Sequence, residues 1–118
     1  MELDPIQVAQ LKVYCPNLSS FDDGEGEAKK TYVLIDGLDL PAGCQPKRVQ
    51  GLLCPFTRDG YTSRLFLSEK ITHNGKGTSW NADGVQIGGR SWWAVSWKTG
   101  TENLTLLGML MAHLKAFK

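Results

Sequence analysis

Hydrophobic residues recur at helical spacing near the start of the chain. Asp4 can cap a helix that begins at Pro5, because a short acidic side chain accepts a bond from a free backbone N–H and proline suits the first turn. The apolar positions that follow form a partly one-sided stripe: Ile6, Ala9, Leu11 and Val13. We therefore expect a short helix that ends near Tyr14, where Pro16 stops it.

The end of the chain carries a second helical pattern. Apolar residues recur there every three or four positions: Leu104, Leu107, Leu110, Met111, Leu114 and Phe117. Thr101 or Glu102 lies near the start of this pattern, and Lys115 and Lys118 lie near its end, where cations suit the helix dipole. The pattern predicts a helix from about Asn103 to Phe117 that packs on a sheet.

Runs of β-branched and aromatic residues lie between the two helical patterns. Three runs, Thr31 to Leu38, Val49 to Phe56 and Arg64 to Ile71, predict strands. A fourth signal is a hairpin, in which Val85 to Ile87 and Arg90 to Trp97 flank the two-residue turn Gly88-Gly89. Residues 19–30 are acidic and rich in turn formers, so we expect a flexible, exposed loop there.

This order of elements predicts an α+β domain with an antiparallel sheet, because no crossover helices separate the strands. A chain of 118 residues that is 42% hydrophobic is long enough for one core, so residues 1–118 are predicted to form a single domain. In the longer arm of the hairpin, the side chains alternate between two sets: Trp93, Val95 and Trp97 on one face, and Trp92, Ala94 and Ser96 on the other. Both faces should be at least partly covered.

Charge and composition exclude several functional classes. A net charge of +1 gives no basic patch for nucleic acid. No apolar run reaches the roughly 20 residues of a membrane span, and the acidic start is unlike a signal peptide, so we expect a soluble cytoplasmic protein. Two histidines without suitable neighbours predict no metal site, and we expect no cofactor. Three cysteines without a paired spacing support neither a disulfide framework nor zinc, and at least two should be plain buried thiols.

Several short motifs, taken in order, resemble a known superfamily. The motifs are Leu11 to Pro16 before the acidic loop, Tyr32 to Ile35, Gly60-Tyr61 before Leu65 to Leu67, and Thr72-His73-Asn74. They resemble ubiquitin-conjugating enzymes and their noncatalytic relatives, the RWD domains. Four further segments are closer to the prokaryotic ubiquitin-conjugating-enzyme-like family E: Leu40 to Gly43, Arg58 to Tyr61, Gly89 to Trp92 and Ala112 to Lys115. The resemblance spans about residues 8 to 117.

The resemblance implies a fold and a set of partners. The fold would have an N-terminal helix, a four-stranded antiparallel meander with an active-site loop, and a C-terminal helix packed on the sheet, here with the Trp-rich hairpin added. The partners would be a bacterial ubiquitin-like protein, a ThiF-like activating enzyme and a deconjugating peptidase, with a role in phage defence.

The catalytic cysteine of that superfamily is missing here. It would follow His73-Asn74, but residues 75–84 contain no cysteine, and no proline follows His73. Asn74 could still place its amide near a developing oxyanion. Ser79, or Thr78 beside it, could form an oxyester with His73 as the base, since a hydroxyl nucleophile needs one. The simpler interpretation is a polar loop that leads to Trp80.

Cys44 and Cys54 are the other candidate nucleophiles. Cys54 lies in an apolar strand, which favours burial. Cys44 follows a turn whose exposure would make its thiol reactive, although no adjacent residue lowers its pKa. On the last helix, His113 borders the apolar stripe and is expected to be a boundary residue with one hydrogen-bonded nitrogen.

Candidate partner-binding residues come from the tryptophans and from one turn. Four tryptophans fall between residues 80 and 97, and we expect Trp80 and Trp92 to be exposed anchors for a protein partner. Arg58, Asp59 and Tyr61 form a polar turn that serves either recognition or chain reversal alone.

Three functional hypotheses remain open. The chain is an atypical carrier of a ubiquitin-like protein, a noncatalytic adaptor in the same pathway, or an RWD-like interaction domain with no role in conjugation.

Overall fold

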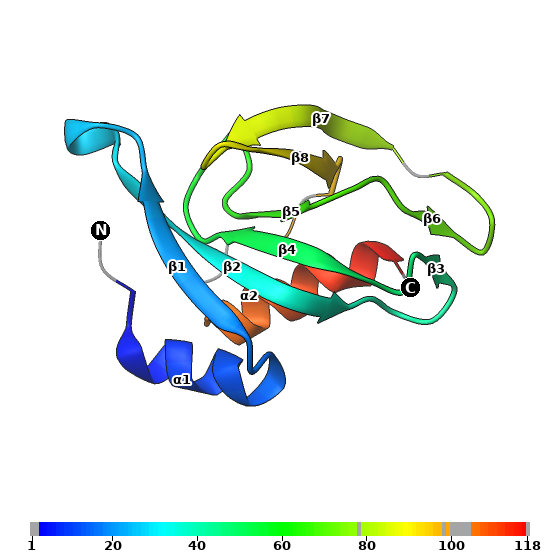
Figure 1. The fold of residues 1–118 in the computed structure, drawn as a ribbon, viewed down its shortest axis with the longest axis horizontal. Coiled ribbons are helices and arrows are strands. Elements are labelled where there is room, and N and C mark those ends of the chain that lie inside the picture. The colour runs from blue at the N-terminus through cyan, green and yellow to red at the C-terminus, as the bar shows by residue number, and fades with distance from the viewer. Residues whose placement is uncertain (1–2, 78, 98, 100–104, 118) are drawn as a thin grey trace.

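The computed structural model describes residues 3–77, 79–97, 99 and 105–117. Helix α1 (Pro5–Tyr14) comes first and α2 (Leu106–Leu114) near the end, with strands between them (Figure 1). The strands are β1 (Leu18–Asp23), β2 (Lys30–Asp39), β3 (Cys44–Gln45), β4 (Arg48–Cys54), β5 (Arg64–Leu67), β6 (Thr72–His73), β7 (Trp80–Ile87) and β8 (Arg90–Val95). Two short 3-10 helices are η1 (Gly26–Ala28) and η2 (Lys115–Phe117).

The strands form one large and one small antiparallel sheet. The six-stranded sheet has the order β1-β2-β4-β5-β8-β7, and β3 pairs with β6 beside it. The first four strands of the large sheet are therefore a meander, and the β7–β8 hairpin extends it through β8. The predicted α+β class with an antiparallel sheet is confirmed.

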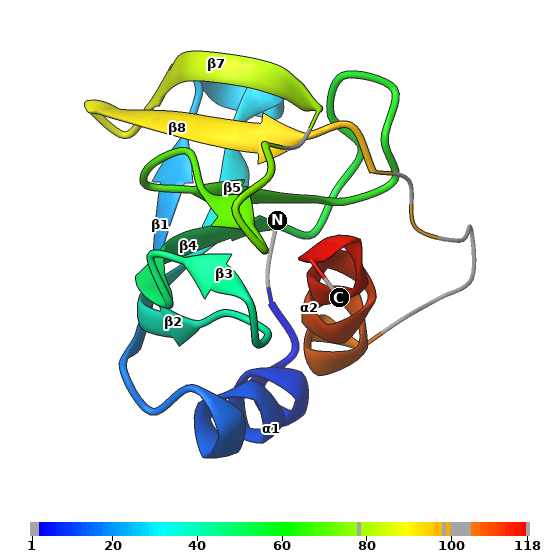
Figure 2. The ribbon, with the colours of Figure 1, turned by 90° about the vertical axis from the view of Figure 1, so that its right-hand side faces the viewer.

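Both helices lie against one face of the sheet (Figure 2). The core on this face is almost entirely aliphatic and includes Leu11, Val33, Ile35, Leu53, Leu67, Leu106, Leu110 and Leu114. The helices also contact each other, because the Leu106 N–H donates to the side-chain oxygen of Gln7 at 3.2 Å. We call this side the helix face.

A second core fills the opposite face, which we call the inner face. Its buried residues are Tyr32, Leu52, Cys54, Phe66, Ala82, Ile87, Trp92 and Ala94. The sheet curls around them: β7 and β8 lie above β5, with β1 and β2 reaching up behind them (Figure 2). Phe21 on β1 touches the β7–β8 turn so closely that a Cβ at Gly88 would lie 2.8 Å from its ring. The two outer strands of the sheet thus approach each other, and both faces are covered as predicted.

The sequence placed most elements correctly. The first helix has the predicted bounds, and the Asp4 carboxylate accepts from the Ile6 N–H at 2.9 Å. Its predicted apolar stripe is wrong in detail, because Leu11 is buried whereas Ile6 and Val13 are exposed. The last helix begins at Leu106 with Thr105 as its cap, and the predicted start at Asn103 lies outside the described residues.

The predicted loop over residues 19–30 is wrong for its first half. Leu18–Asp23 forms β1, paired with β2 over six residues, and Gly26–Ala28 is a 3-10 helix. β1 is an outer strand with a mostly exposed surface, and such strands tolerate the serines and aspartates that indicated a loop.

Candidate functional site

The His73-Asn74 element is a tight hairpin turn. His73 and Lys76 exchange two backbone hydrogen bonds, of 2.8 and 3.0 Å, across Asn74 and Gly75. Both central residues have positive φ, 53° and 77°, which is the type I′ geometry that Asn-Gly favours. Asn74 is exposed and its N–H donates to the carbonyl of Gly43 at 2.8 Å. The turn therefore accounts for Asn74 without a catalytic role.

Cys44 lies directly opposite His73, although 28 residues separate them in the sequence. The two residues are paired between β3 and β6, so a thiol does belong to the segment beside the His73-Asn74 turn. Its side chain, however, is 0% exposed and its sulfur faces the carbonyl of Phe117 at 3.9 Å. Burial raises the pKa of this thiol. The sequence prediction that exposure would make Cys44 reactive does not hold, because the turn before it directs the sulfur into the core.

The other two thiols are also buried. Cys54 is 0% exposed, and burial raises its pKa to about 12. Its sulfur lies 3.7 Å from the carbonyl of Phe56. Cys15, at the end of α1, is 7% exposed and its pKa is raised by burial and then by the nearby charge of Asp39. All three cysteines of the chain are therefore free, buried and protonated near neutral pH.

Ser79 is exposed, as a nucleophile would have to be, but the described residues around it include no base. It lines a surface hollow of about 180 Å³ together with Val95, Ser96, Trp97 and Ala116. Its carbonyl accepts from the Ser96 N–H at 2.8 Å, which anchors the start of β7. Neither histidine lines this hollow. Thr78, the alternative hydroxyl, lies outside the described residues.

The tryptophans differ from the sequence prediction. Trp92 is 1% exposed, and its indole N–H donates to the carbonyl of Ile87 at 3.1 Å, so its predicted role as an exposed anchor is wrong. Strand alternation puts Trp92 with Ala94 on the inner face, where curling of the sheet covers it. Trp80 is half-buried against the helix-face core. Trp97, at 38%, is the exposed tryptophan, with its N–H bound to the carbonyl of Ala112 at 3.0 Å.

The turn from Arg58 to Tyr61 has the same geometry as the His73 turn. Arg58 and Tyr61 exchange two hydrogen bonds of 2.9 Å, and Asp59 and Gly60 have φ of 54° and 83°. The interpretation as a well-formed turn is confirmed. The sequence analysis predicted a two-residue hairpin turn at Gly88-Gly89 but not at Asp59-Gly60, although Asp-Gly is also a preferred pair for such a turn.

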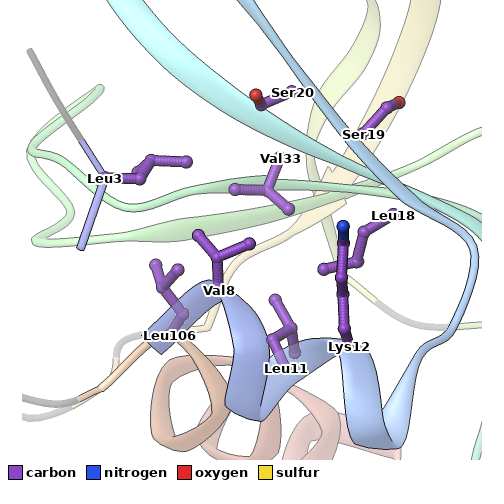
Figure 3. Close-up of a pocket in the computed structure, with 9 residues that line it drawn as sticks. All are labelled: Leu3, Val8, Leu11, Lys12, Leu18, Ser19, Ser20, Val33 and Leu106. Carbon is purple, nitrogen blue, oxygen red and sulfur yellow. The ribbon is translucent and has the colours of Figure 1, made fainter. Parts of the chain in front are cut away.

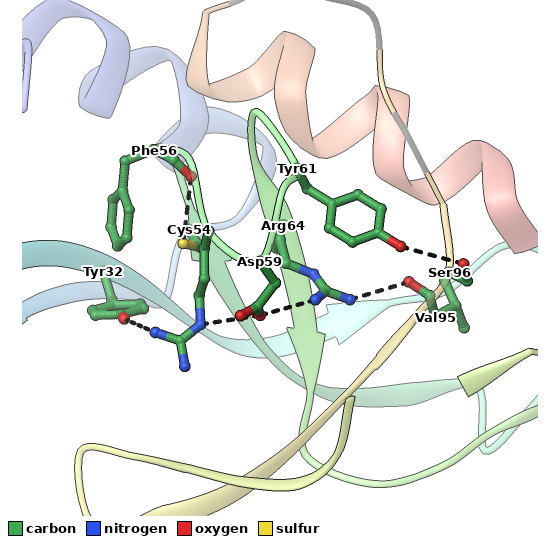
Figure 4. A network of polar contacts seen from close by, with 9 residues as sticks. Tyr32, Cys54, Phe56, Asp59, Tyr61, Arg64, Val95 and Ser96 are labelled. Atoms are coloured by element: carbon green, nitrogen blue, oxygen red, sulfur yellow. Dashed lines mark hydrogen bonds and ion pairs between the residues drawn. The ribbon is translucent and has the colours of Figure 1, made fainter. Parts of the chain in front are cut away.

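Arg64, which sequence reasoning missed, is the centre of a network around that turn (Figure 4). Its side chain is 2% exposed, pairs with Asp59 at 3.1 Å and donates to the carbonyl of Val95 at 3.4 Å. Its guanidinium lies 4.3 Å from the centre of the Tyr61 ring, and Tyr61 itself contacts Ser96 at 3.2 Å. These contacts hold the turn in place.

Arg58 belongs to the same network. It donates to the Tyr32 hydroxyl at 2.9 Å, and its guanidinium lies over the Phe66 ring at 5.6 Å. Its Nε is 3.6 Å from the Asp59 carboxylate, which is an ion pair too long for a hydrogen bond. Arg58 and Tyr61 are therefore engaged within the protein, which leaves little of either side chain for a partner.

His113 pairs with Ser63 inside the protein. The His113 Nε2 and Ser63 Oγ atoms are 2.9 Å apart, and the residues are 6% and 4% exposed. Burial, followed by the positive charge of Arg64, lowers the pKa of His113 to about 4. The imidazole is thus neutral at pH 7, and a base that weak and that enclosed suits a structural hydrogen bond. The predicted single hydrogen-bonded nitrogen is observed, with more burial than a boundary position implies.

The described part of the chain has neither a cluster of metal-ligating residues nor a helix that could cross a membrane. Within it, no group of three histidine, cysteine or acidic residues is arranged to hold a metal ion. None of the helices seen there is long and apolar enough to cross a membrane.

Comparison of the chain with family models, with curated proteins and with solved structures gave no match.

Proposed function

We propose that this chain is a noncatalytic protein-binding component of a bacterial ubiquitin-like conjugation pathway, with a domain of the ubiquitin-conjugating-enzyme type. One observation carries the noncatalytic part: the thiol that pairs with the His73 segment is fully buried, with its sulfur facing the carbonyl of Phe117. A carrier thiol must ionise and must be reached by the carboxyl terminus that it accepts. Cys44 meets neither condition.

The order and packing of the elements support the conjugating-enzyme part of the proposal. An N-terminal helix precedes a meander of β1, β2, β4 and β5, and α2 packs on one face of that sheet. The sheet is larger than a plain four-stranded meander, because β8 pairs with β5 and the β7–β8 hairpin continues the sheet. The ordered motifs of the sequence remain the reason to name ubiquitin-like partners.

The surface around Trp97 is the best candidate for binding such a partner. Trp97 is the most exposed tryptophan, and it lines the same hollow as Ser79 at the end of the hairpin. Its indole N–H is fixed to α2 through Ala112, so the ring is held in one orientation before binding. A rigid, exposed aromatic ring loses little entropy on contact, which is why tryptophan is favoured at interface centres.

The oxyester carrier remains the second candidate, because Ser79 is exposed beside this hollow. It requires a base that the described residues around Ser79 do not supply. The noncatalytic proposal therefore predicts that Ser79 stays unmodified.

A charging assay tests the proposal. The protein is mixed with ATP, a bacterial ubiquitin-like protein and the ThiF-like enzyme that activates it, and its intact mass is measured. We expect no adduct while the activating enzyme itself is charged. A thiol-sensitive adduct that Cys44→Ser removes, or a hydroxylamine-sensitive one that Ser79→Ala removes, would show that the chain is a carrier.

A binding measurement tests the pathway separately. Titration calorimetry with each of the two proteins should give binding that Trp97→Ala weakens at least about tenfold, the loss typical of an interface centre. Tyr14→Ala is the matched control, since Tyr14 is an exposed aromatic on α1. If neither protein binds, the role in conjugation is wrong, and an interaction domain outside that pathway is the remaining hypothesis.

A further inference from the structure

The outer edge of β1 has backbone groups free to pair with another strand. Just before β1, the Asp36 N–H donates to the carbonyl of Asn17 at 2.9 Å, and the antiparallel register continues from there. Because backbone bonds alternate along such a pair, the N–H and C=O groups of Leu18, Ser20 and Asp22 point away from β2. Within the described residues, no backbone bond joins these groups to another segment.

An apolar groove runs along this edge, between β1 and α1 (Figure 3). It has a volume of about 110 Å³ and is lined mainly by aliphatic side chains, among them Leu3, Val8, Leu18, Val33 and Leu106. A cavity somewhat larger than this, about 150 Å³, holds a benzene molecule, so the groove has room for one aliphatic side chain. The edge and the groove together fit an extended peptide whose alternate side chains face α1.

One end of the groove is closed. Three residues connect the end of α1 to the start of β1, so the walls of the groove join there. Lys12, in the last turn of α1, lies at this closed end beside Leu18 (Figure 3). Lys12 is exposed and forms no ion pair with the residues that the structure describes. A peptide that reaches this point cannot continue in the same direction.

The charges select the direction of the peptide. Beyond the open end lie the exposed residues Asp22, Asp23, Glu25 and Glu27, and only Asp22 is seen in an ion pair, with Lys29. A strand antiparallel to β1 would run from these acidic residues toward Lys12 and would end with its carboxylate beside the ammonium group. The opposite direction would bring a free amino terminus against Lys12, or a carboxylate against the acidic residues.

We propose that the groove between α1 and β1 binds the carboxyl-terminal tail of a partner protein, as an added strand antiparallel to β1. The tail has an aliphatic residue at or next to its end and basic residues several positions earlier. The backbone groups of Leu18 and Ser20 hold it, the groove takes the aliphatic side chain, and Lys12 binds the terminal carboxylate. This site lies apart from the Trp97 surface and does not depend on the proposed function.

Display of random heptapeptides with free carboxyl ends provides the probe. Peptides enriched on the full chain should end in an aliphatic residue, and each is then synthesised with a fluorescent label, once as the free acid and once as the terminal amide. Fluorescence polarisation should show the amide binding about 10- to 100-fold more weakly, as expected for loss of a charge-assisted hydrogen bond. Equal binding of both forms would overturn the proposal.

Three variants locate the site. Lys12→Glu should weaken the free acid at least tenfold, and Lys76→Glu, at the exposed His73 turn, is the matched control that should not. Ser20→Pro removes an outward N–H without breaking a bond to β2, so it should abolish binding while thermal unfolding stays cooperative. Amide shifts in a ¹⁵N spectrum should centre on the residues that line the groove, in α1 and β1 and around Val33 and Leu106.

No enriched peptide, shifts centred elsewhere, or binding that Ser20→Pro leaves intact would each reject the groove. Concentration-dependent dimers that Ser20→Pro dissolves would mean that β1 pairs with a second copy of the chain, which would also reject the proposal.

Discussion

The two faces of the sheet are closed in different ways. On the helix face, α1 and α2 cover aliphatic side chains contributed by strands far apart in the sequence. On the inner face, curling of the sheet covers an aromatic core around Tyr32, Phe66 and Trp92. The helix face needs separate elements to close it, whereas the inner face closes through the shape of the sheet itself.

The two faces differ in the charge that is buried on them. Among the buried polar and charged residues that the structure describes, Arg64 is the one that carries a charge near pH 7. On the inner face, Arg64 shares a strand face with Phe66 and is 2% exposed, yet it is paired with Asp59 and lies over aromatic rings. A buried cation persists because its charge is compensated by a carboxylate and by ring faces. Specific polar contacts thus hold the Arg58–Tyr61 turn beside the inner face, whereas the helix face is held by packing together with the hydrogen bond between His113 and Ser63.

Among the predicted changes, loss of packing on the helix face should lower the free energy of unfolding most. Leu110 is 0% exposed at the centre of α2, so Leu110→Ala should lower the free energy of unfolding by about 3 to 4 kcal/mol. Leu107, half-buried one turn away, is the matched control and should lose about 1 to 2 kcal/mol when changed to alanine. Urea denaturation measures both. Equal losses would mean that α2 is not packed on the sheet through Leu110.

His113 tests how helix α2 is fixed to the start of β5. Its pKa is about 4 in the folded protein and about 6.5 when unfolded, so below pH 6.5 the unfolded chain binds the extra proton more readily. This residue alone should therefore destabilise the fold progressively from pH 6.5 to pH 4, by about 3 kcal/mol at most. The difference in denaturation free energy between the parent and His113→Gln, followed across this range, measures the effect. Parallel pH profiles would show that His113 is not buried against Ser63.

The helix face was easier to predict from the sequence than the inner face. Helical spacing of leucines in the last segment and the Asp4-Pro5 start identified both helices, because these signals are local. Strand β1 was missed, since an outer strand gains its structure from pairing with β2 and its serines and aspartates indicate a turn. Burial of Trp92 was missed for a related reason: it depends on how far the sheet curls, and no short segment encodes that curvature.

The candidate site was predicted less well than the fold. His73 and Asn74 were identified, but the pairing of His73 with Cys44 joins residues with 28 others between them and has no local signal. The direction of the Cys44 side chain, into the core, follows only from that pairing. The Asn74-Gly75 and Asp59-Gly60 turns, in contrast, could have been predicted, because Asn-Gly and Asp-Gly are the preferred pairs for type I′ hairpins.

The ion pair between the buried Arg64 and Asp59 should contribute more to the free energy of unfolding than a pair on the open surface. Asp59→Asn keeps a residue suited to positive φ but leaves Arg64 buried without its carboxylate, so we expect a loss of about 2 kcal/mol. Asp39→Asn breaks an exposed pair with Arg48, where water screens both charges, and should cost much less. Thermal and urea unfolding compare the two variants. A loss at Asp59 as small as that at Asp39 would mean that the aromatic rings alone compensate Arg64.

The smallest predicted difference in stability, between Gly88→Ala and Gly89→Ala, tests whether the sheet curls far enough for its outer strands to meet. Gly88 and Gly89 both have positive φ, 60° and 78°, so alanine at either should cost about 1 kcal/mol from backbone strain. A Cβ at Gly88 would also lie 2.8 Å from the Phe21 ring, whereas one at Gly89 meets nothing within 4 Å. Gly88→Ala should therefore destabilise the protein by about 1 kcal/mol more than Gly89→Ala, because the ring must move. In the Phe21→Leu background, where the ring is absent, this difference should disappear. Equal losses in the parent protein would mean that β1 does not reach the β7–β8 turn, and that the inner face is closed less tightly than the helix face.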